Sequence, residues 1–337
     1  MNKIEFGDCR DTMRRWDAEG VRVQTCVTSP PYYGLRDYGV IGQIGLEQTP
    51  EQYVAAMVEV FRCVRDVLAD DGTLWVNIGD SYAANGRSGL NTGWAKRAKE
   101  YAGGGHRAEP SRHRGEKRVP EGLKPKDLIG IPWMLAFALR ADGWYLRQDI
   151  IWHKPNPKPE SVRDRCTKAH EYVFLLSKSE RYYYDHKAVL EDAKWERWGD
   201  QTVIKEQQGT AKWIGNKSKA ELQVLGKKNR RSVWTVATRP YKGAHFATFP
   251  PALIEPCILA GSRPGDVVLD PFMGSGTTAA VSLQHGRKYL GCELNPDYEP
   301  LQQERIGLST HEKPAAMPSR RSFKPTQTQP AQCGLFI

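Results

Sequence analysis

The hydrophobic positions of the chain follow two periods, and segments with one period alternate with segments with the other. Tyr53, Met57, Val60, Phe61 and Val64 recur at helical spacing, which predicts an amphipathic helix over 52–68. Short runs rich in β-branched and aromatic residues predict strands at 21–28, 73–78, 144–152, 171–176, 266–270 and 288–293, after an opening strand–turn unit. A turn is expected at 71–72, and further helices at 131–140, 251–259 and from 277 onward. This alternation predicts an α/β fold, a doubly wound and mostly parallel sheet with helices on both faces.

Two insertions and a tail interrupt this pattern. Residues 85–126 are rich in Gly, Arg, His and Ser without periodicity, which predicts a mobile loop. Residues 186–231 are polar and Lys-rich with interspersed tryptophans, and we expect a recognition module there. From 308 to 337 the composition shifts to Ser, Pro, Gln and Thr, which is typical of a disordered tail. We therefore expect one domain over 1–307 that carries both insertions.

The positive charge of the chain lies in the two insertions. The 49 Lys and Arg against 39 Asp and Glu give the chain a net charge of +10. Residues 85–126 hold eleven basic and four acidic side chains, a net of +7, and residues 186–231 hold eleven and six, a net of +5. The remaining chain is therefore slightly acidic, at about −2. This distribution favours a polyanionic partner that is contacted by the insertions.

Several classes of protein are excluded by pattern. No run approaches the roughly 18 apolar residues of a membrane span, and the first residues lack the apolar core of a signal peptide, so we expect a soluble intracellular protein without a membrane partner. The odd number of cysteines and their scattered spacing argue against a disulfide framework and against a zinc site, and no metal is expected. The seven lie at positions 9, 26, 63, 166, 257, 292 and 333.

A glycine-rich segment near the C-terminus has the chemistry of a nucleotide-type site. The predicted strand 266–270 ends at Asp270, the turn Pro-Phe-Met-Gly-Ser-Gly follows, and a helix is expected from Thr277. Glycines let the backbone approach a ligand, and free N–H groups at a helix start attract anionic groups. The next strand ends at Glu293, 19 residues past Gly274, near the spacing at which an acid binds ribose hydroxyls. The strand, turn, helix, second strand and acid in this order indicate a cofactor site much more strongly than the glycine-rich turn alone.

A second motif, Thr28-Ser29-Pro30-Pro31-Tyr32, follows the predicted strand 21–28. Open α/β sheets bind ligands beyond the carboxyl ends of their strands. Two prolines aim carbonyl oxygens rigidly, Ser29 adds another acceptor, and Tyr32 offers a stacking face. A bare Pro-Pro-Tyr is more often an exposed turn, so the motif gains meaning from its place beside the glycine-rich segment.

Together the two motifs resemble those of amino-methylating DNA methyltransferases that use S-adenosylmethionine. Ser29–Tyr32 is similar to their catalytic motif, and Asp270–Thr278 is similar to their cofactor motif. The catalytic motif precedes the cofactor motif, which is the circularly permuted order of the β group. The resemblance spans about residues 4–300 and includes segments 7–9, 149–156 and 245–250. It implies a Rossmann-like methyltransferase sheet, double-stranded DNA as partner and a cytoplasmic enzyme of bacterial or phage origin. It leaves open a cognate restriction enzyme and a homodimer.

The resemblance also implies roles for individual residues. The catalytic motif is Ser29, Pro30, Pro31 and Tyr32, in which the Ser29 side chain and the Pro30 carbonyl accept from the target amine. Tyr32 is the implied platform for a base that leaves the helix stack. The implied cofactor contacts are Glu293 on the ribose, Asp8 near the adenine amine, Phe272 packed on the ligand, and Asp270, Gly274, Ser275, Gly276 and Thr277 around the methionine end. Trp152, Lys154 and Asn156 are candidates for the target-base pocket, and Lys96, Arg97 and Lys99 for DNA phosphate contacts.

The expected target base depends on a single position of the catalytic motif, Ser29. Among relatives, Ser-Pro-Pro-Tyr is more common in enzymes that make N4-methylcytosine, and Asp-Pro-Pro-Tyr in those that make N6-methyladenine. We therefore expect methylation of cytosine N4, with adenine N6 as the alternative. A non-catalytic nucleic-acid-binding protein with a relic cofactor fold and an RNA or protein methyltransferase are further alternatives. A cytosine-C5 enzyme needs a nucleophilic cysteine, but Cys257 lies in an apolar helix-like stretch and is interpreted as core.

Overall fold

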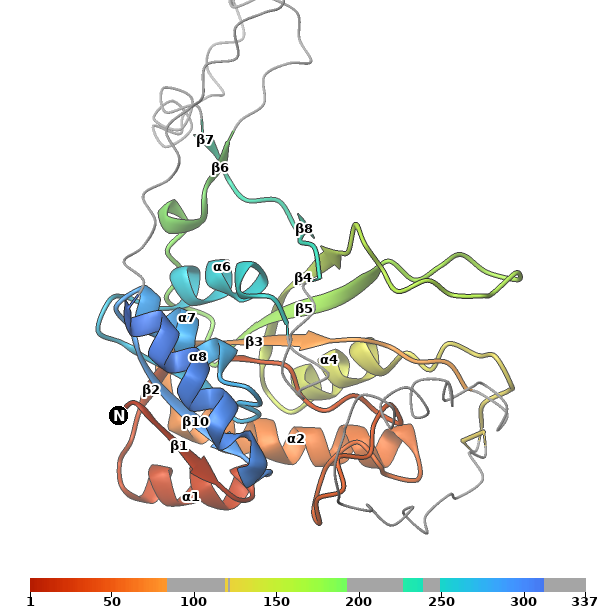
Figure 1. Ribbon diagram of the computed structural model, residues 1–337, viewed down its shortest axis with the longest axis horizontal. Coiled ribbons are helices and arrows are strands. Elements are labelled where there is room, and N and C mark those ends of the chain that lie inside the picture. The colour runs from red at the N-terminus through yellow and green to blue at the C-terminus, as the bar shows by residue number, and fades with distance from the viewer. Residues whose placement is uncertain (84–118, 121, 193–226, 239–248, 312–337) are drawn as a thin grey trace, which may run out of the picture.

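The fold is a three-layer sandwich in which helices cover both faces of a central sheet (Figure 1). The computed structural model describes residues 1–83, 119–120, 122–192, 227–238 and 249–311. Eight strands form the main sheet, in the order β1-β10-β9-β2-β3-β5-β4-β8. Their bounds are β1 Lys3–Phe6, β2 Val23–Thr28, β3 Leu68–Ile78, β4 Tyr145–His153, β5 His170–Ser177, β8 Val233–Thr235, β9 Val267–Asp270 and β10 Lys288–Glu293.

Neighbouring strands of this sheet run parallel except at β5, which is antiparallel to both β3 and β4. The predicted mostly parallel sheet is therefore confirmed. Because β5 runs the other way, its first residues lie at the same edge of the sheet as the carboxyl ends of its neighbours. This edge is the one that carries the motifs.

Three hydrophobic clusters attach the helical layers to the sheet, and the smallest of them packs α7 and α8 against β10. One face is covered by α1 (Cys9–Ala18), α2 (Pro50–Val67) and α4 (Ile131–Ala141), and the other by α6 (Pro251–Gly261), α7 (Thr277–Gln284) and α8 (Glu299–His311) (Figure 1). The largest core joins α1, α2 and α4 to the sheet through fully buried residues such as Trp16, Phe61 and Leu135. The second core packs α6 on the opposite face. The doubly wound arrangement is thus confirmed.

Local signals explain where the helices begin. Thr49 accepts a hydrogen bond from the backbone N–H of Gln52 and Pro50 occupies the first turn, so α2 has a standard cap. Asp8 caps α1 in the same way by accepting from the N–H of Arg10. Helix α1 is absent from the sequence-based prediction, because its buried positions 9, 12, 13 and 16 alternate with many charged residues. Helix α8 spans position 308, where the tail was expected to begin.

Strand β3 differs from the prediction at its beginning. It starts at Leu68, immediately after α2, whereas the pattern places the strand at 73–78 behind a turn. The pairing with β2 moves from Val23–Leu68 to Thr25–Thr73, so three extra residues of β3 bulge out. The expected turn at 71–72 therefore occurs as a bulge within the strand.

The second insertion leaves the body through a short two-stranded stem. Strand β6 (Glu191–Asp192) pairs antiparallel with β7 (Lys227–Lys228), after the 3₁₀ turn η1 (Lys187–Val189). Lys227 forms an ion pair with Asp192 at 2.6 Å, and both Lys228 and Arg231 contact Glu191. The basic side chains at the base of this insertion are thus matched by acids.

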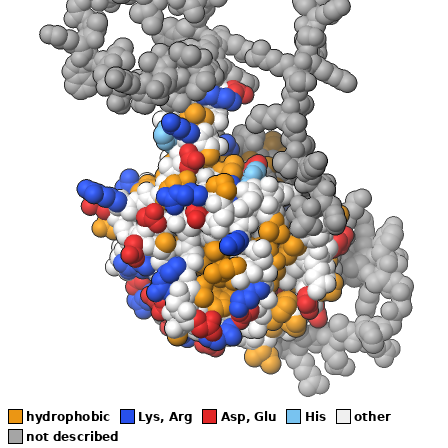
Figure 2. Space-filling view, turned by 90° about the vertical axis from the view of Figure 1, so that its left-hand side faces the viewer, with side chains coloured by type: hydrophobic (Ala, Val, Ile, Leu, Met, Phe, Trp, Pro, Cys, Tyr) orange, Lys and Arg blue, Asp and Glu red, His pale blue; other side chains and the backbone are white. Residues whose placement is uncertain are grey.

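On the side seen in Figure 2, no single charge dominates the surface of the described body, because basic and acidic side chains are interspersed among hydrophobic ones.

Among the described helices, none is long and apolar enough to cross a membrane. The 3₁₀ turn η3 (Pro296–Tyr298) connects β10 to α8.

Candidate active site at the carboxyl edge of the sheet

The two motifs meet at the point in the sheet where the strand order reverses. From β2 the chain continues to β3 on one side, while β9 and then β10 extend the sheet on the other side. Ligands bind at such switch points in open α/β sheets. The Thr28 hydroxyl at the end of β2 donates to Asp270 at the end of β9, with 2.6 Å between Oγ1 and Oδ1. The segments that follow these two residues are the predicted catalytic and cofactor motifs.

Asp270 holds this junction together. Its carboxylate is 1% exposed and also accepts from the Thr278 hydroxyl at 2.6 Å and the Phe272 backbone N–H at 3.0 Å. Burial raises the pKa of the Asp270 carboxyl to about 6, and the hydrogen bonds from Thr278 and Thr28 act in the opposite direction. Asp270 thereby connects β2, β9 and α7 at the start of the glycine-rich turn.

The glycine-rich turn is fixed by Glu293. Gly274 and Gly276 have φ values of 54° and 83°, in the left-handed region that favours glycine. The Glu293 carboxylate accepts from the backbone N–H groups of Gly274 at 2.8 Å and of Asn295 at 2.9 Å. Burial raises the pKa of Glu293, and these two N–H groups oppose the shift. A carboxylate has about four acceptor positions, so Glu293 keeps acceptor capacity for a ligand hydroxyl.

The turn also contains a buried polar atom that fits a ligand. Ser275 is 2% exposed, and its Oγ has no hydrogen-bond partner among the described residues. Buried hydroxyl groups nearly always have a partner, so this unpaired one beside a glycine-rich turn is available to a polar ligand. The neighbouring Thr277 hydroxyl accepts from Arg305.

Asp8 follows β1 at the same edge, and Arg10 fills most of the acceptor positions of its carboxylate. Its Oδ1 accepts from the backbone N–H and Nε of Arg10 at 2.8 and 3.0 Å, and its Oδ2 accepts from Nη2 at 2.6 Å. Arg10 therefore lowers the pKa of Asp8, chiefly through the side-chain hydrogen bond. One acceptor position of the carboxylate remains free, on Oδ2.

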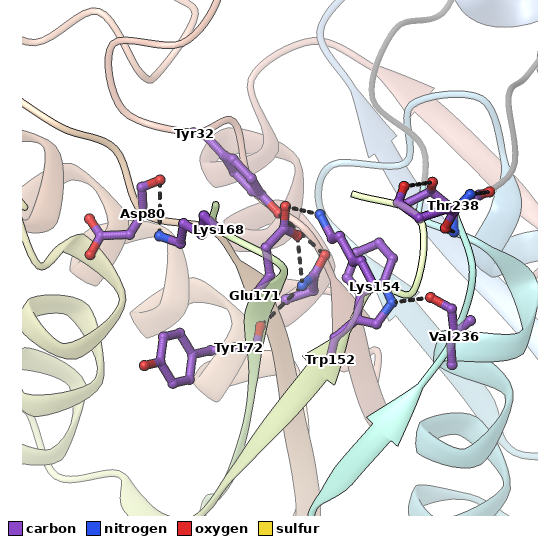
Figure 3. A network of polar contacts seen from close by, with 11 residues as sticks. Tyr32, Asp80, Trp152, Lys154, Lys168, Glu171, Tyr172, Val236 and Thr238 are labelled. Atoms are coloured by element: carbon purple, nitrogen blue, oxygen red, sulfur yellow. Dashed lines mark hydrogen bonds and ion pairs between the residues drawn. The ribbon is translucent and has the colours of Figure 1, made fainter. Parts of the chain in front are cut away.

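The Ser-Pro-Pro-Tyr motif is held by groups beneath it. The hydroxyl of the fully buried Tyr53 in α2 donates to the Pro31 carbonyl at 2.8 Å. Among the described residues, no hydrogen bond is made to the Pro30 carbonyl, so this oxygen is available as an acceptor. The Tyr32 hydroxyl donates to Glu171 at 2.8 Å (Figure 3). Burial and the nearby Glu171 carboxylate raise the pKa of Tyr32 well above its ordinary value, so the hydroxyl stays protonated.

The three predicted pocket residues at the end of β4 lie in different surroundings. Trp152 is 4% exposed, packs in the second core and donates from Nε1 to the Val236 carbonyl at 2.8 Å. Lys154 lies over the Trp152 ring, 4.2 Å from its centroid, and forms an ion pair with Glu171. Asn156 instead exchanges hydrogen bonds with the backbone of Thr238. Lys154 is therefore the one of the three that is joined to the catalytic motif.

Sequence reasoning missed the side chains that support Tyr32 from the neighbouring strands. Glu171 is the second residue of β5, and the buried Asn77 near the end of β3 places its Oδ1 3.3 Å from the Tyr32 hydroxyl. Gly79 follows β3, and a Cβ there would lie 2.7 Å from the Tyr32 ring. One signal in the sequence could have indicated this site: the polar Asn77 interrupts an apolar run that ends in Gly79-Asp80.

Comparisons with known proteins agree with this geometry. The model of the N6/N4 DNA methylase family matches residues 23–304. The Type II methyltransferase M.SmaI of Serratia marcescens is 50% identical over 90% of this chain and 90% of its own length. The chain belongs to the DNA methylase family. The methyl donor of this DNA methyltransferase is S-adenosylmethionine, and its target is an exocyclic nitrogen, N4 of cytosine or N6 of adenine.

Solved structures of low sequence identity share the methyltransferase fold. The PvuII DNA methyltransferase, described as cytosine-N4-specific, superposes with a TM-score of 0.55 at 18% identity and covers 90% of this chain and 86% of its own. A putative DNA modification methylase from Thermus thermophilus, solved with S-adenosyl-L-methionine, gives a TM-score of 0.55 at 23% identity over 92% of this chain and 95% of its own. The predicted Rossmann-like fold is therefore confirmed.

Other expectations have different outcomes. Cys257 is 1% exposed within α6 and burial raises the pKa of its thiol, so its interpretation as a core residue is confirmed. The six cysteines of the described part of the chain are free, and no group of three metal-ligating side chains occurs within it. Lys96, Arg97 and Lys99 lie outside the described residues, as do residues 245–248 of the resemblance.

Proposed function

We propose that this DNA methyltransferase transfers the methyl group to the exocyclic N4 of cytosine in double-stranded DNA. The observation that carries the choice of cytosine is Ser29, a neutral acceptor where family members that methylate adenine more often carry Asp. The shared fold with a solved enzyme described as cytosine-N4-specific is consistent with the same choice. Adenine N6 is the alternative, because both bases present the same local N–C=N arrangement to the motif.

The catalytic motif activates the target amine through two acceptors. The lone pair of an exocyclic amine is delocalised into the ring, which makes the nitrogen a poor nucleophile. Ser29 Oγ and the Pro30 carbonyl each accept one N–H, which favours a pyramidal nitrogen whose lone pair points at the methyl group. The bond from Tyr53 to the Pro31 carbonyl supports this assignment, because it fixes the backbone and leaves Pro30 available. The rest of the acceleration comes from positioning.

The cofactor supplies an electrophilic methyl group on a sulfonium, and the glycine-rich turn has the groups to hold it. Glu293 keeps acceptor capacity beyond its bonds to the backbone, and ribose hydroxyls can use it. Ser275 offers its unpaired buried hydroxyl to the methionine end, and Phe272 packs beside it. Asp8 directs its remaining acceptor position to the adenine amine. Asp270 contributes through the bonds that hold the turn rather than through a ligand contact of its own.

Product analysis tests this function. The full-length protein is incubated with tritiated S-adenosylmethionine and unmethylated duplex DNA, and the DNA is digested to nucleosides. We expect the label in N4-methyldeoxycytidine, and Cys257→Ala should label the same nucleoside at an unchanged rate. Label confined to N6-methyldeoxyadenosine would overturn the choice of base within the same family. Tight cofactor binding without labelled DNA would instead support a non-catalytic nucleic-acid-binding protein.

A further inference from the structure

A carboxylate that no motif includes joins three strands at the target side of the site. Glu171 is the second residue of β5, and its side chain is 17% exposed. Its Oε2 accepts from the Tyr32 hydroxyl at 2.8 Å, and its Oε1 accepts from the ammonium of Lys154 (Figure 3). One carboxylate thus connects the catalytic motif after β2 with the end of β4.

We propose that Glu171 is the positioning residue of the Tyr32 ring, which it holds at a fixed height and tilt to receive the extrahelical base. The inference rests on the stacking role proposed for Tyr32 and is independent of which base is methylated. A ring that is already oriented loses little conformational freedom when a base stacks on it.

Backbone also packs against the same ring, beside its hydroxyl bond to Glu171. A Cβ built on Gly79 would lie 2.7 Å from Cε2 of Tyr32 and 3.3 Å from Cδ of Glu171. The ring therefore lies directly against backbone at the end of β3, with no space for a side chain between them. Asn77 places a second acceptor 3.3 Å from the Tyr32 hydroxyl and is itself fixed by donating to the Tyr172 carbonyl at 3.0 Å.

The charge of Glu171 is balanced from β4. The Lys154 ammonium contacts the carboxylate and also lies 4.2 Å from the centroid of the Trp152 ring, a cation–π arrangement. Trp152 is fixed by its bond to the Val236 carbonyl. A paired carboxylate is a strong acceptor that stays in place, whereas an unpaired one in this half-buried site would turn toward water. Lys154 therefore acts on Tyr32 through Glu171.

Removing the hydroxyl and removing the carboxylate test this coupling together. Tyr32→Phe, Glu171→Ala and the double variant are assayed for total methyl transfer to duplex DNA, with kcat and the KM for DNA determined separately. Each single variant should lower kcat by about 10- to 100-fold, the value of a hydrogen bond to a charged group. The double variant should be no slower than the slower single variant, because both changes remove one interaction. Losses that multiply would overturn the proposal.

Conservative and steric variants separate positioning from stability. Glu171→Gln keeps an oxygen for the Tyr32 hydroxyl but loses the charge that pairs with Lys154, so it should recover part of the kcat that Glu171→Ala loses. Gly79→Ala should lower kcat by displacing the ring, whereas Gly307→Ala, where a Cβ meets nothing within 4 Å, should not. If Gly79→Ala keeps full activity, or if the kcat of Glu171→Gln is as low as that of Glu171→Ala, Glu171 does not act by positioning Tyr32.

Glu5 is the matched control for a purely structural carboxylate. It is 20% exposed, forms an ion pair with Lys3 and accepts from Nε1 of Trp16 at 3.0 Å, on the far strand β1. Glu5→Ala should lower the melting temperature about as much as Glu171→Ala and leave kcat unchanged. Equal loss of kcat in both variants would assign Glu171 to stability alone. Total methyl transfer is the readout, so an adenine product would overturn the proposed base and leave this test intact.

Discussion

The carboxyl edge of the sheet is constructed differently on its two sides. On the cofactor side, Glu293 binds the backbone N–H groups of Gly274 and Asn295, and Asp270 binds the hydroxyls of Thr28 and Thr278. On the target side, Tyr32 and Lys154 meet at Glu171 through side chains that come from separate strands. The first side is organised mainly within the segment from Asp270 to Asn295, with one bond to Thr28 at the end of β2, whereas the second is assembled by the fold from separate strands.

This difference predicts two distinguishable kinds of loss. A cofactor contact acts equally in the ground state and the transition state, whereas polarisation of the target amine grows as the methyl group transfers. Changes on the cofactor side should therefore weaken binding, and changes at the catalytic motif should slow the chemical step.

The largest effect is expected at the catalytic motif. Ser29→Ala removes an acceptor of the target amine and Tyr32→Ala removes the stacking face, so each should lower kcat by about 100- to 1000-fold, as loss of a transition-state contact does elsewhere. The affinity for S-adenosylmethionine, measured by calorimetry, should change less than about twofold. A loss of cofactor affinity equal to that of a Glu293 variant would contradict the separation of the two sides.

A large effect on stability is expected at Asp270. Its raised pKa means that the folded protein holds this proton up to about pH 6, while the unfolded chain releases it near 3.8. The associated stability is present at low pH and lost as the pH rises from about 4 to about 6, by roughly 3 kcal/mol. Denaturant unfolding across this range should show the decline relative to Asp270→Asn. The exposed Asp297→Asn is the control, and parallel profiles for all three proteins would contradict the prediction.

A moderate effect is expected at Glu293. Glu293→Ala should raise the dissociation constant for S-adenosylmethionine about 10- to 100-fold, because two charge-assisted hydrogen bonds to the ribose are lost. At saturating cofactor, kcat should stay near its original value. Glu304, an exposed carboxylate on α8, provides the matched alanine control. If kcat falls while affinity is kept, Glu293 does not bind the cofactor as proposed.

The smallest effect is expected in the first insertion. Replacing Lys96, Arg97 and Lys99 with Gln should weaken binding to all DNA sequences alike. The slope of log affinity against log salt should become shallower by up to about 2.7, since each phosphate contact contributes about 0.9. Binding titrations over a range of salt concentrations measure this slope.

A control for the total charge lies at the opposite edge of the sheet. Arg22, Arg263 and Lys288 are exposed and precede or begin strands, so they lie away from the carboxyl edge. Replacing these three with Gln removes the same charge and should leave the slope nearly unchanged. Equal changes in both triple variants would show that net charge, and not a phosphate clamp, governs affinity.

The same difference explains how much the sequence could predict. Strand, turn, helix and acid follow one another between Asp270 and Glu293, so the order alone located that segment, and hydrophobic periodicity gave the doubly wound sheet. Helix α1 was missed because its apolar face is narrow among charged residues. The bulge in β3 was read as a turn because pairing register depends on the partner strand.

The target side could not be derived in this way. Tyr32 and Glu171 are 139 residues apart, and only the antiparallel course of β5 brings the start of that strand to the carboxyl edge. Trp152 was expected to line the target-base pocket because it lies in segment 149–156, which resembles the family. Its burial in the second core depends on α6, which lies about a hundred residues later in the chain.

The paired stem of the second insertion has an evolutionary consequence. Asp192 and Lys227 leave the body side by side, held by ladder hydrogen bonds and an ion pair of 2.6 Å. The contacts of the stem offset the entropy lost when these two points are held together. Because loop-closure entropy depends only weakly on loop length, a longer or shorter segment between them changes the stability little. Recombination at the stem can therefore exchange whole segments between relatives while the core, its switch point and its methyl-donor turn are inherited intact.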